Sequence, residues 1–258
     1  MMGARFKVSV VPAQSASKDY AVDIQQDRRG EFFELRVPER MQGSLDVNVL
    51  QADKRDRHLL LFVRPSEGKP ARFLCGHDER EWFVAAVPGG ASSVPQAKEA
   101  LKPVVIRARQ NRLKVPTRLR NRRRNAAFRR QGEWFFVPAS GWNRDPINEK
   151  FVLYNEPLRR GAGKAHIVEQ LFRVAGELVY VCPKHPNGVS EARYRQLLQN
   201  QPGASQWGWQ ALRRNPRVYA RGRIRHPDHA TITLPDWHRV VLNTETETET
   251  MRNVAFID

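Results

Sequence analysis

The chain has 258 residues, of which 40% are hydrophobic and 28% are charged, and its formal net charge at pH 7 is +17. This composition is typical of a globular protein and excludes an intrinsically disordered chain. No apolar run approaches the roughly 20 residues that a membrane-spanning helix needs, and two cysteines exclude a disulfide framework. We therefore expect a cytoplasmic protein with no membrane partner.

The first part of the chain predicts a succession of short strands. Apolar and β-branched runs alternate with polar or Pro/Gly segments at the spacing of about 8–12 residues that is typical of a sandwich or barrel. The run His58–Val63 is continuously apolar, which predicts a central strand buried on both faces. The expected strands are Arg5–Val11, Tyr20–Ile24, Phe32–Val37, Asp46–Leu50, His58–Val63, Arg72–Cys75 and Glu81–Val87.

A short helix follows these strands. The segment Ser92–Leu101 combines a serine cap with an early proline, which predicts a short helix over these residues. Residues 1–102 are therefore predicted to form an antiparallel β-rich domain, a barrel or a sandwich, closed by this helix.

Residues 103–132, here the arginine-rich segment, are predicted to connect two domains. Residues 100–132 contain twelve Lys and Arg residues and no Asp or Glu. By contrast, residues 1–99 have 15 basic and 14 acidic residues, and residues 133–258 have 17 basic and 13 acidic residues. The positive charge is therefore local, and a concentrated positive field attracts polyanions. Pro103 and Pro116 exclude one long helix, so both a shorter helix and an arm that orders on a ligand are compatible with the pattern.

The preference for arginine over lysine narrows the class of binding partner. The chain has 34 Arg and 10 Lys, and a guanidinium group pairs bidentately with phosphate and stacks on bases. A high genomic GC content explains an excess of arginine but not its clustering. The sequence predicts nucleic acid as the partner, and the alternative is a connector that docks an acidic protein. The predicted phosphate-binding residues are Arg118, Arg120, Arg122, Arg123, Arg124, Arg129 and Arg130.

Residues 133–258 are predicted to form a second, α+β domain that ends in a β-meander. Strands are expected at Trp134–Val137, Ile167–Val174 and Glu177–Val181. The segment Ser190–Gln199 predicts a capped amphipathic helix that buries Ala192, Leu197 and Leu198.

A hairpin over residues 219–234 is predicted to carry a second basic surface. Arg221, Arg223 and Arg225 alternate with apolar residues, and His229, Thr231 and Thr233 do so after the turn. A three-residue loop at 226–228 keeps both polar faces together, pairing Arg225 with His229 and Arg223 with Thr231. Arginines and hydroxyl groups on one sheet face suit a phosphate backbone, and Tyr219 or Trp237 is a candidate for base stacking.

The histidines of this hairpin suggest an alternative function. Two histidines and an arginine supply the base, the acid and the phosphate-binding cation of a metal-independent ribonuclease. His226 and His229, next to Arg225, therefore define a candidate nuclease or phosphoesterase site. A role in the turn or the core is the simpler interpretation, and the alternation of His238 with Val240 places His238 toward the core.

Two pairs of soft ligands define a weaker, zinc-binding alternative. Cys75 and His77 have Cys-x-His spacing, and Cys182 and His185 have Cys-x2-His spacing, so that together they would supply four ligands. The main prediction remains a nucleic-acid-binding protein without a cofactor, with RNA favoured over DNA. We expect it to act in a nucleoprotein assembly, with other proteins of that assembly as further partners.

Overall fold

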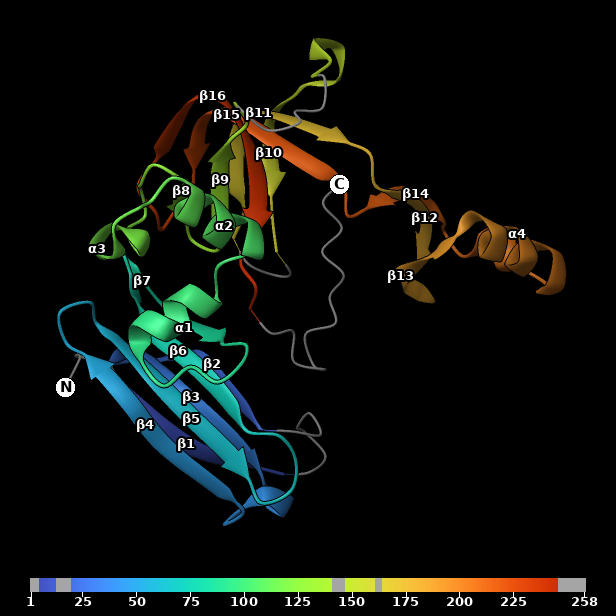
Figure 1. Cartoon of the computed structure of the whole chain (residues 1–258). Helices are drawn as coiled ribbons and strands as arrows, with labels where there is room; N and C mark the ends of the chain where they lie inside the picture. Colours follow the sequence, from blue (N-terminus) through green and yellow to red (C-terminus); the bar gives the residue numbers. More distant parts are fainter. Residues whose placement is uncertain (1–4, 13–19, 141–146, 161–163, 246–258) are drawn as a thin grey trace. The chain divides into compact units, whose positions relative to one another are not determined.

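The protein is described by a computed structural model that covers residues 5–12, 20–140, 147–160 and 164–245 (Figure 1). Most of its regular structure is β-strand, which confirms the β-rich class. The chain divides into two compact units, the first formed by the described residues of Met1–Trp134 and Leu242–Met251, and the second by those of Phe135–Val241. No helix in the described part of the chain is long and apolar enough to span a membrane.

All seven strands predicted for the first part of the chain are present in unit 1. Each strand coincides with an apolar or alternating run of residues, and a Pro, Gly or charged turn residue lies at its end. The strands are β1 (Arg5–Val11), β2 (Ala21–Asp27), β3 (Gly30–Pro38), β4 (Leu45–Asp53), β5 (His58–Pro65), β6 (Ala71–Asp78) and β7 (Glu81–Ala86), with a 3-10 turn at Glu39–Met41.

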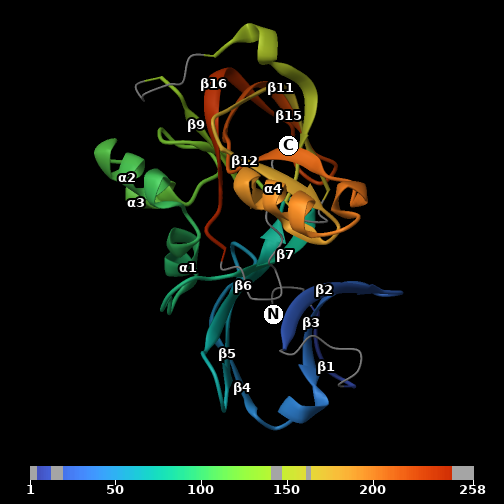
Figure 2. The same ribbon diagram turned by 90° about the vertical axis from the view of Figure 1, so that its right-hand side faces the viewer.

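These strands form two open sheets, with the orders β1-β3-β2 and β4-β5-β6-β7. The barrel alternative is therefore wrong. The antiparallel prediction holds for all pairs except β1 and β3, which run parallel. The two sheets face each other (Figure 2) and share one apolar cluster that contains Phe33, Leu61, Val63 and Phe73.

The central strand of the larger sheet is buried on both faces, as predicted. Leu61 and Val63 of β5 point into the cluster between the sheets, whereas Leu60 packs on Ala97 of the helix α1 (Val94–Ala100). The side chain of Ser93 accepts a hydrogen bond from the backbone N–H of Gln96, which confirms the predicted cap.

The arginine-rich segment, predicted to be a connector, lies within unit 1 and is folded. It forms the helices α2 (Val104–Arg112) and α3 (Thr117–Arg120), followed by the strand β8 (Arg129–Gln131). Each helix begins directly after a proline, where the missing N–H costs no hydrogen bond. Ile106, Ala127 and Phe128 are buried, so this basic segment also contributes apolar side chains to the interior of the protein.

Unit 2 is built on a sheet with the strand order β10-β11-β15-β16-β9, and β8 lies next to β9 where the chain enters the unit. Its buried side chains include Leu171, Ile224 and Leu234. The strands are β9 (Trp134–Pro138), β10 (Leu153–Leu158), β11 (His166–Val174), β15 (Arg217–Arg225) and β16 (Ile232–Leu242), with a 3-10 turn at Glu149–Phe151.

A separate three-stranded sheet is inserted between β11 and β15. It has the order β13-β12-β14 and consists of β12 (Glu177–Cys182), β13 (His185–Ser190) and β14 (Gln210–Arg214). The helix α4 (Glu191–Asn200) and a 3-10 turn at Ala204–Gln206 connect β13 to β14. Ser190 caps α4 as predicted and Leu197 is buried, but Ala192 and Leu198 are exposed because only one row of α4 faces the sheet.

Acid should destabilise unit 1 through His58. Burial, with a smaller effect of Lys98, lowers the pKa of His58 from 6.5 to about 4. Between these two pH values the histidine binds a proton in the unfolded chain but not in the folded chain. The contribution of His58 to the free energy of unfolding is therefore fully present above pH 6.5 and is lost as the pH falls toward 4. We expect the free energy of unfolding to fall by up to about 3 kcal/mol. Denaturant unfolding at pH 7 and pH 4.5 measures this change. The loss should shrink in His58→Gln, and parallel pH profiles for the two proteins would contradict this role.

Candidate functional site

Local hydrogen bonds fold the arginine-rich segment. The side-chain oxygen of Asn125 accepts hydrogen bonds from the backbone N–H groups of Ala127, at 2.8 Å, and Phe128, at 3.3 Å. The side-chain amide of Gln110 donates to the carbonyl oxygen of Arg120 at 2.8 Å. These contacts close the turn after α3, next to which Phe128 is buried.

Three of the seven arginines predicted to bind phosphate form ion pairs with acidic residues of unit 1, and a fourth is half-buried. Arg123 forms ion pairs with Asp78 and Glu79. Arg130 reaches Asp78 at 3.2 Å, and Arg120 lies 3.6 Å from Glu99. Arg129 is half-buried, and its pKa is lowered by burial and by the charge of Arg124. The three ion-paired arginines hold the segment in place, and neighbouring carboxylates partly offset their charge.

The other three predicted arginines are exposed. Arg118, Arg122 and Arg124 form no ion pair with any residue that the structure describes. The same holds for Arg112 and Lys114, which are exposed at the end of α2 and were absent from the predicted set. We call these five residues the basic surface: Arg112, Lys114, Arg118, Arg122 and Arg124.

The predicted hairpin is present, but its loop is longer than expected. Arg223 pairs with Thr233 and Ile224 with Ile232, so the three-residue loop and the pairing of Arg223 with Thr231 are wrong. The faces are as predicted, because a shift by two residues preserves the alternation. The loop is longer because Asp228 turns back inside it, where its backbone N–H donates to Nδ1 of His226 at 3.1 Å.

The arginines of the hairpin are engaged by neighbouring strands. Arg223 forms an ion pair with Glu169 at 3.0 Å, and Arg225 donates to the side chain of Asn155 at 3.0 Å. Arg221 lies over the ring of Trp237, 4.6 Å from its centre. Trp237 and Tyr219 are themselves buried in an apolar cluster, so neither is available to stack on a base. The hairpin is therefore a weaker phosphate surface than the sequence suggested.

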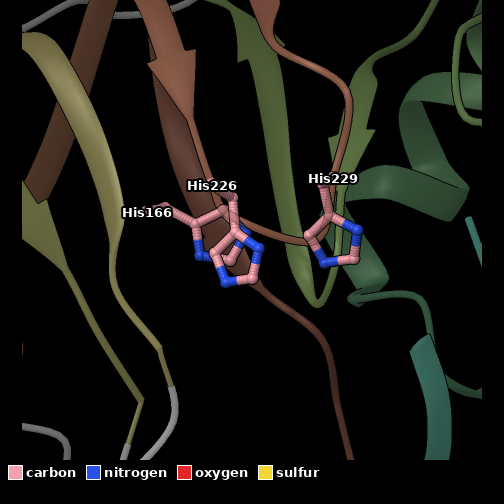
Figure 3. A group of neighbouring side chains, drawn as sticks. All are labelled: His166, His226 and His229. Atoms are coloured by element: carbon pink, nitrogen blue, oxygen red, sulfur yellow. The ribbon is translucent and has the colours of Figure 1, made fainter. Parts of the chain in front are cut away.

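Three histidines lie together in unit 2, at one end of the sheet that contains β11 and β15 (Figure 3). His166 begins β11, His226 follows the end of β15, and His229 lies in the loop before β16. Each offers one ring nitrogen, and these nitrogens lie within 4.8 Å of one another. The ring centres of His166 and His226 are 4.3 Å apart, and those of His226 and His229 are 4.6 Å apart. The structure thus brings together the two histidines predicted from the sequence and adds a third.

Sequence reasoning missed His166 because it lies some 60 residues before the other two along the chain. Its place follows from the strand pairing, in which Ile167 of β11 lies opposite Arg225 of β15. The residue before Ile167 therefore lies opposite the residue after Arg225, which is His226. A correct prediction of this antiparallel pair would have found the third histidine.

His166 is the most deeply buried member of the cluster. His166 is 2% exposed, and its pKa is lowered from 6.5 to about 3 by burial and by the neighbouring His226 and His229. Neither ring nitrogen of His166 has a hydrogen-bond partner among the described residues. A neutral imidazole with an available lone pair is a metal ligand rather than a cation.

One carboxylate borders the cluster. An Asp228 carboxylate oxygen lies 3.8 Å from Nδ1 of His226, and Lys164 holds the same oxygen at 2.7 Å. The arrangement resembles the outer shell of metal sites, in which a carboxylate orients a ligating imidazole.

The two cysteine–histidine pairs of the zinc alternative lie in different units. Cys75 is fully buried in the apolar cluster of unit 1, and burial raises the pKa of its thiol to about 12. This disfavours the thiolate that a metal requires. Cys182 and His185 pair across the β12–β13 turn, where the ring of His185 stacks on Trp209.

An aromatic cluster covers the inserted sheet. Trp207 and Trp209 are half-buried and have ring centres 5.9 Å apart. The ammonium group of Lys184 lies 4.0 Å from the ring centre of Trp207, and Tyr180 and Tyr194 stack beside these residues. A partly exposed tryptophan beside a lysine is suited to stacking on a base.

Comparison of the chain with protein-family models, with curated proteins and with solved structures finds no match. The basic surface, the aromatic cluster and the three histidines are therefore the features that bear on function.

Proposed function

We propose that the protein binds nucleic acid, with RNA favoured over DNA, as a component of a nucleoprotein assembly. The observation that carries the proposal is the basic surface, five exposed cations on a folded segment without a single acidic residue. The ion pairs of Arg123 and Arg130 hold this segment on unit 1, so its charges are ordered before a ligand arrives. An ordered array of cations loses less conformational entropy on binding than a flexible arm.

The aromatic cluster supports binding of a single strand, the form in which proteins most often recognise RNA. Sequence-tolerant binding of single strands combines phosphate contacts with stacking of bases on aromatic rings. Trp207 and Trp209 are half-buried, so each leaves part of its surface for a base, and Lys184 lies beside them. The hairpin arginines supply further contacts in this proposal, with less free charge because Glu169 offsets Arg223.

The nucleic acid that co-purifies with the protein tests this function. We expect bound RNA after purification at low salt, identified by sequencing and removed by ribonuclease treatment. Recovery of an acidic protein without nucleic acid would instead favour the adaptor alternative. Cleavage of labelled RNA in the presence of a chelator, abolished in His229→Ala, would favour the metal-independent nuclease that uses His226 and His229.

A further inference from the structure

We propose that His166, His226 and His229 form a binding site for a divalent transition metal ion, with Zn²⁺ as the expected occupant. This inference goes beyond nucleic-acid binding and does not depend on it. It rests on three nitrogen donors that converge from the start of β11 and from the loop that joins β15 to β16.

The spacing of the donors is close to that of a metal site. Ligand nitrogens around a tetrahedral zinc, at about 2.0–2.1 Å from the metal, are about 3.3 Å apart. The ring nitrogens of the three histidines lie within 4.8 Å of one another. Rotation of the stacked rings, with a small adjustment of the loop that carries His229, would complete the approach. His166 needs no such loop movement because its backbone is fixed by the pairing of β11 with β15.

His166 is the strongest single indication. A buried polar atom without a hydrogen bond costs free energy, and such atoms are rare in native proteins. Both ring nitrogens of His166 are buried and have no hydrogen-bond partner in the described part of the chain. A metal ion on one nitrogen would explain why a histidine occupies a position that is only 2% exposed.

The donor set of three imidazole nitrogens decides which metals the site would take. Nitrogen donors select zinc and its neighbours in the transition series, whereas calcium and magnesium prefer oxygen.

Asp228 supplies the expected outer shell. In the structure, Nδ1 of His226 accepts a hydrogen bond from the backbone N–H of Asp228. A metal on the other nitrogen, Nε2, requires the proton on Nδ1, so this hydrogen bond would be lost on metal binding. The Asp228 carboxylate oxygen, now 3.8 Å from Nδ1, would then move closer to accept that proton. Lys164 keeps this carboxylate beside the ring. The three histidines leave one position of a tetrahedral site open, an arrangement typical of catalytic rather than structural zinc sites.

Titration of the metal-free protein with Zn²⁺ tests the proposal. Calorimetry should show one tight site per chain, and Co²⁺ should give the visible absorption of a tetrahedral complex. His229→Ala, on a half-buried loop residue, should abolish the site while circular dichroism stays unchanged. Asp228→Asn should weaken binding by about 10–100-fold, less than the loss of a ligand.

Two control variants separate this site from other histidines. His77→Ala in unit 1 and His185→Ala in the inserted sheet should bind Zn²⁺ as tightly as the wild type. Zinc should raise the melting temperature of the wild type and of both controls, but not that of His229→Ala. The proposal is overturned if the wild type binds no zinc, if His229→Ala binds it equally well, or if His185→Ala loses it.

Discussion

Replacement of Arg118, Arg122 and Arg124 by glutamine is expected to weaken binding of single-stranded RNA by at least about tenfold at low salt. These residues are exposed and form no ion pair with a described residue, so their charge is available to phosphates. Glutamine keeps a polar, hydrogen-bonding side chain, although a shorter one, and removes the charge. Fluorescence anisotropy with a labelled RNA at 50–100 mM salt is the measurement.

A matched variant controls for the loss of net charge. Arg28, Arg29 and Arg40 are also exposed in unit 1 but lie outside the arginine-rich segment. Their replacement by glutamine removes an equal number of positive charges. It should change the affinity much less, because it reduces only the long-range electrostatic attraction of the whole protein. Equal losses in the two triple variants would show that RNA is attracted by net charge and not by the basic surface.

Asp78→Asn is expected to release the arginine-rich segment from unit 1. The Asp78 carboxylate pairs with both Arg123 and Arg130, and its side chain is only 13% exposed. Breaking a buried ion pair costs about 3–5 kcal/mol. Because the two arginines are partly exposed, we expect a smaller loss of about 1–2 kcal/mol in the free energy of unfolding. Trypsin should then cut the turn after α3 faster than in the wild type.

The control for this variant is Asp46→Asn. Asp46 pairs with Arg64 in the same unit, but both side chains are well exposed, and such a pair contributes about 0–1 kcal/mol. We expect little change in stability and no change in the rate of cleavage within the arginine-rich segment. If Asp78→Asn behaves like Asp46→Asn in the trypsin experiment, Asp78 does not anchor the segment.

The strands of unit 1 could be predicted because their signals are local. Each is a short apolar or alternating run with a turn residue at its end, and the burial of β5 on both faces follows from its continuous apolar sequence. How the strands pair is not local. The parallel pairing of β1 with β3 and the open edges of both sheets depend on contacts between distant residues, which no periodicity encodes.

The candidate site likewise combines features that local sequence shows with features that depend on contacts between distant residues. The clustering of charge in residues 100–132 is visible in the sequence, but which arginines are free is decided by acidic side chains elsewhere, such as Asp78 and Glu99. His226 and His229 are close in sequence and were found as a pair. His166 joins them through the pairing of β11 with β15, and the loop that holds them is longer than its polar pattern suggested.

The salt dependence of RNA binding tests the central claim most directly. Each phosphate neutralised on a single strand contributes about 0.7 to the slope of log affinity against log salt concentration. If the five cations of the basic surface all contact phosphates, the wild-type slope should be about −3 to −4, and the variant without Arg118, Arg122 and Arg124 should lose about 2 of that slope. A wild-type slope near zero, or a slope that these three substitutions leave unchanged, would contradict nucleic-acid binding at this surface.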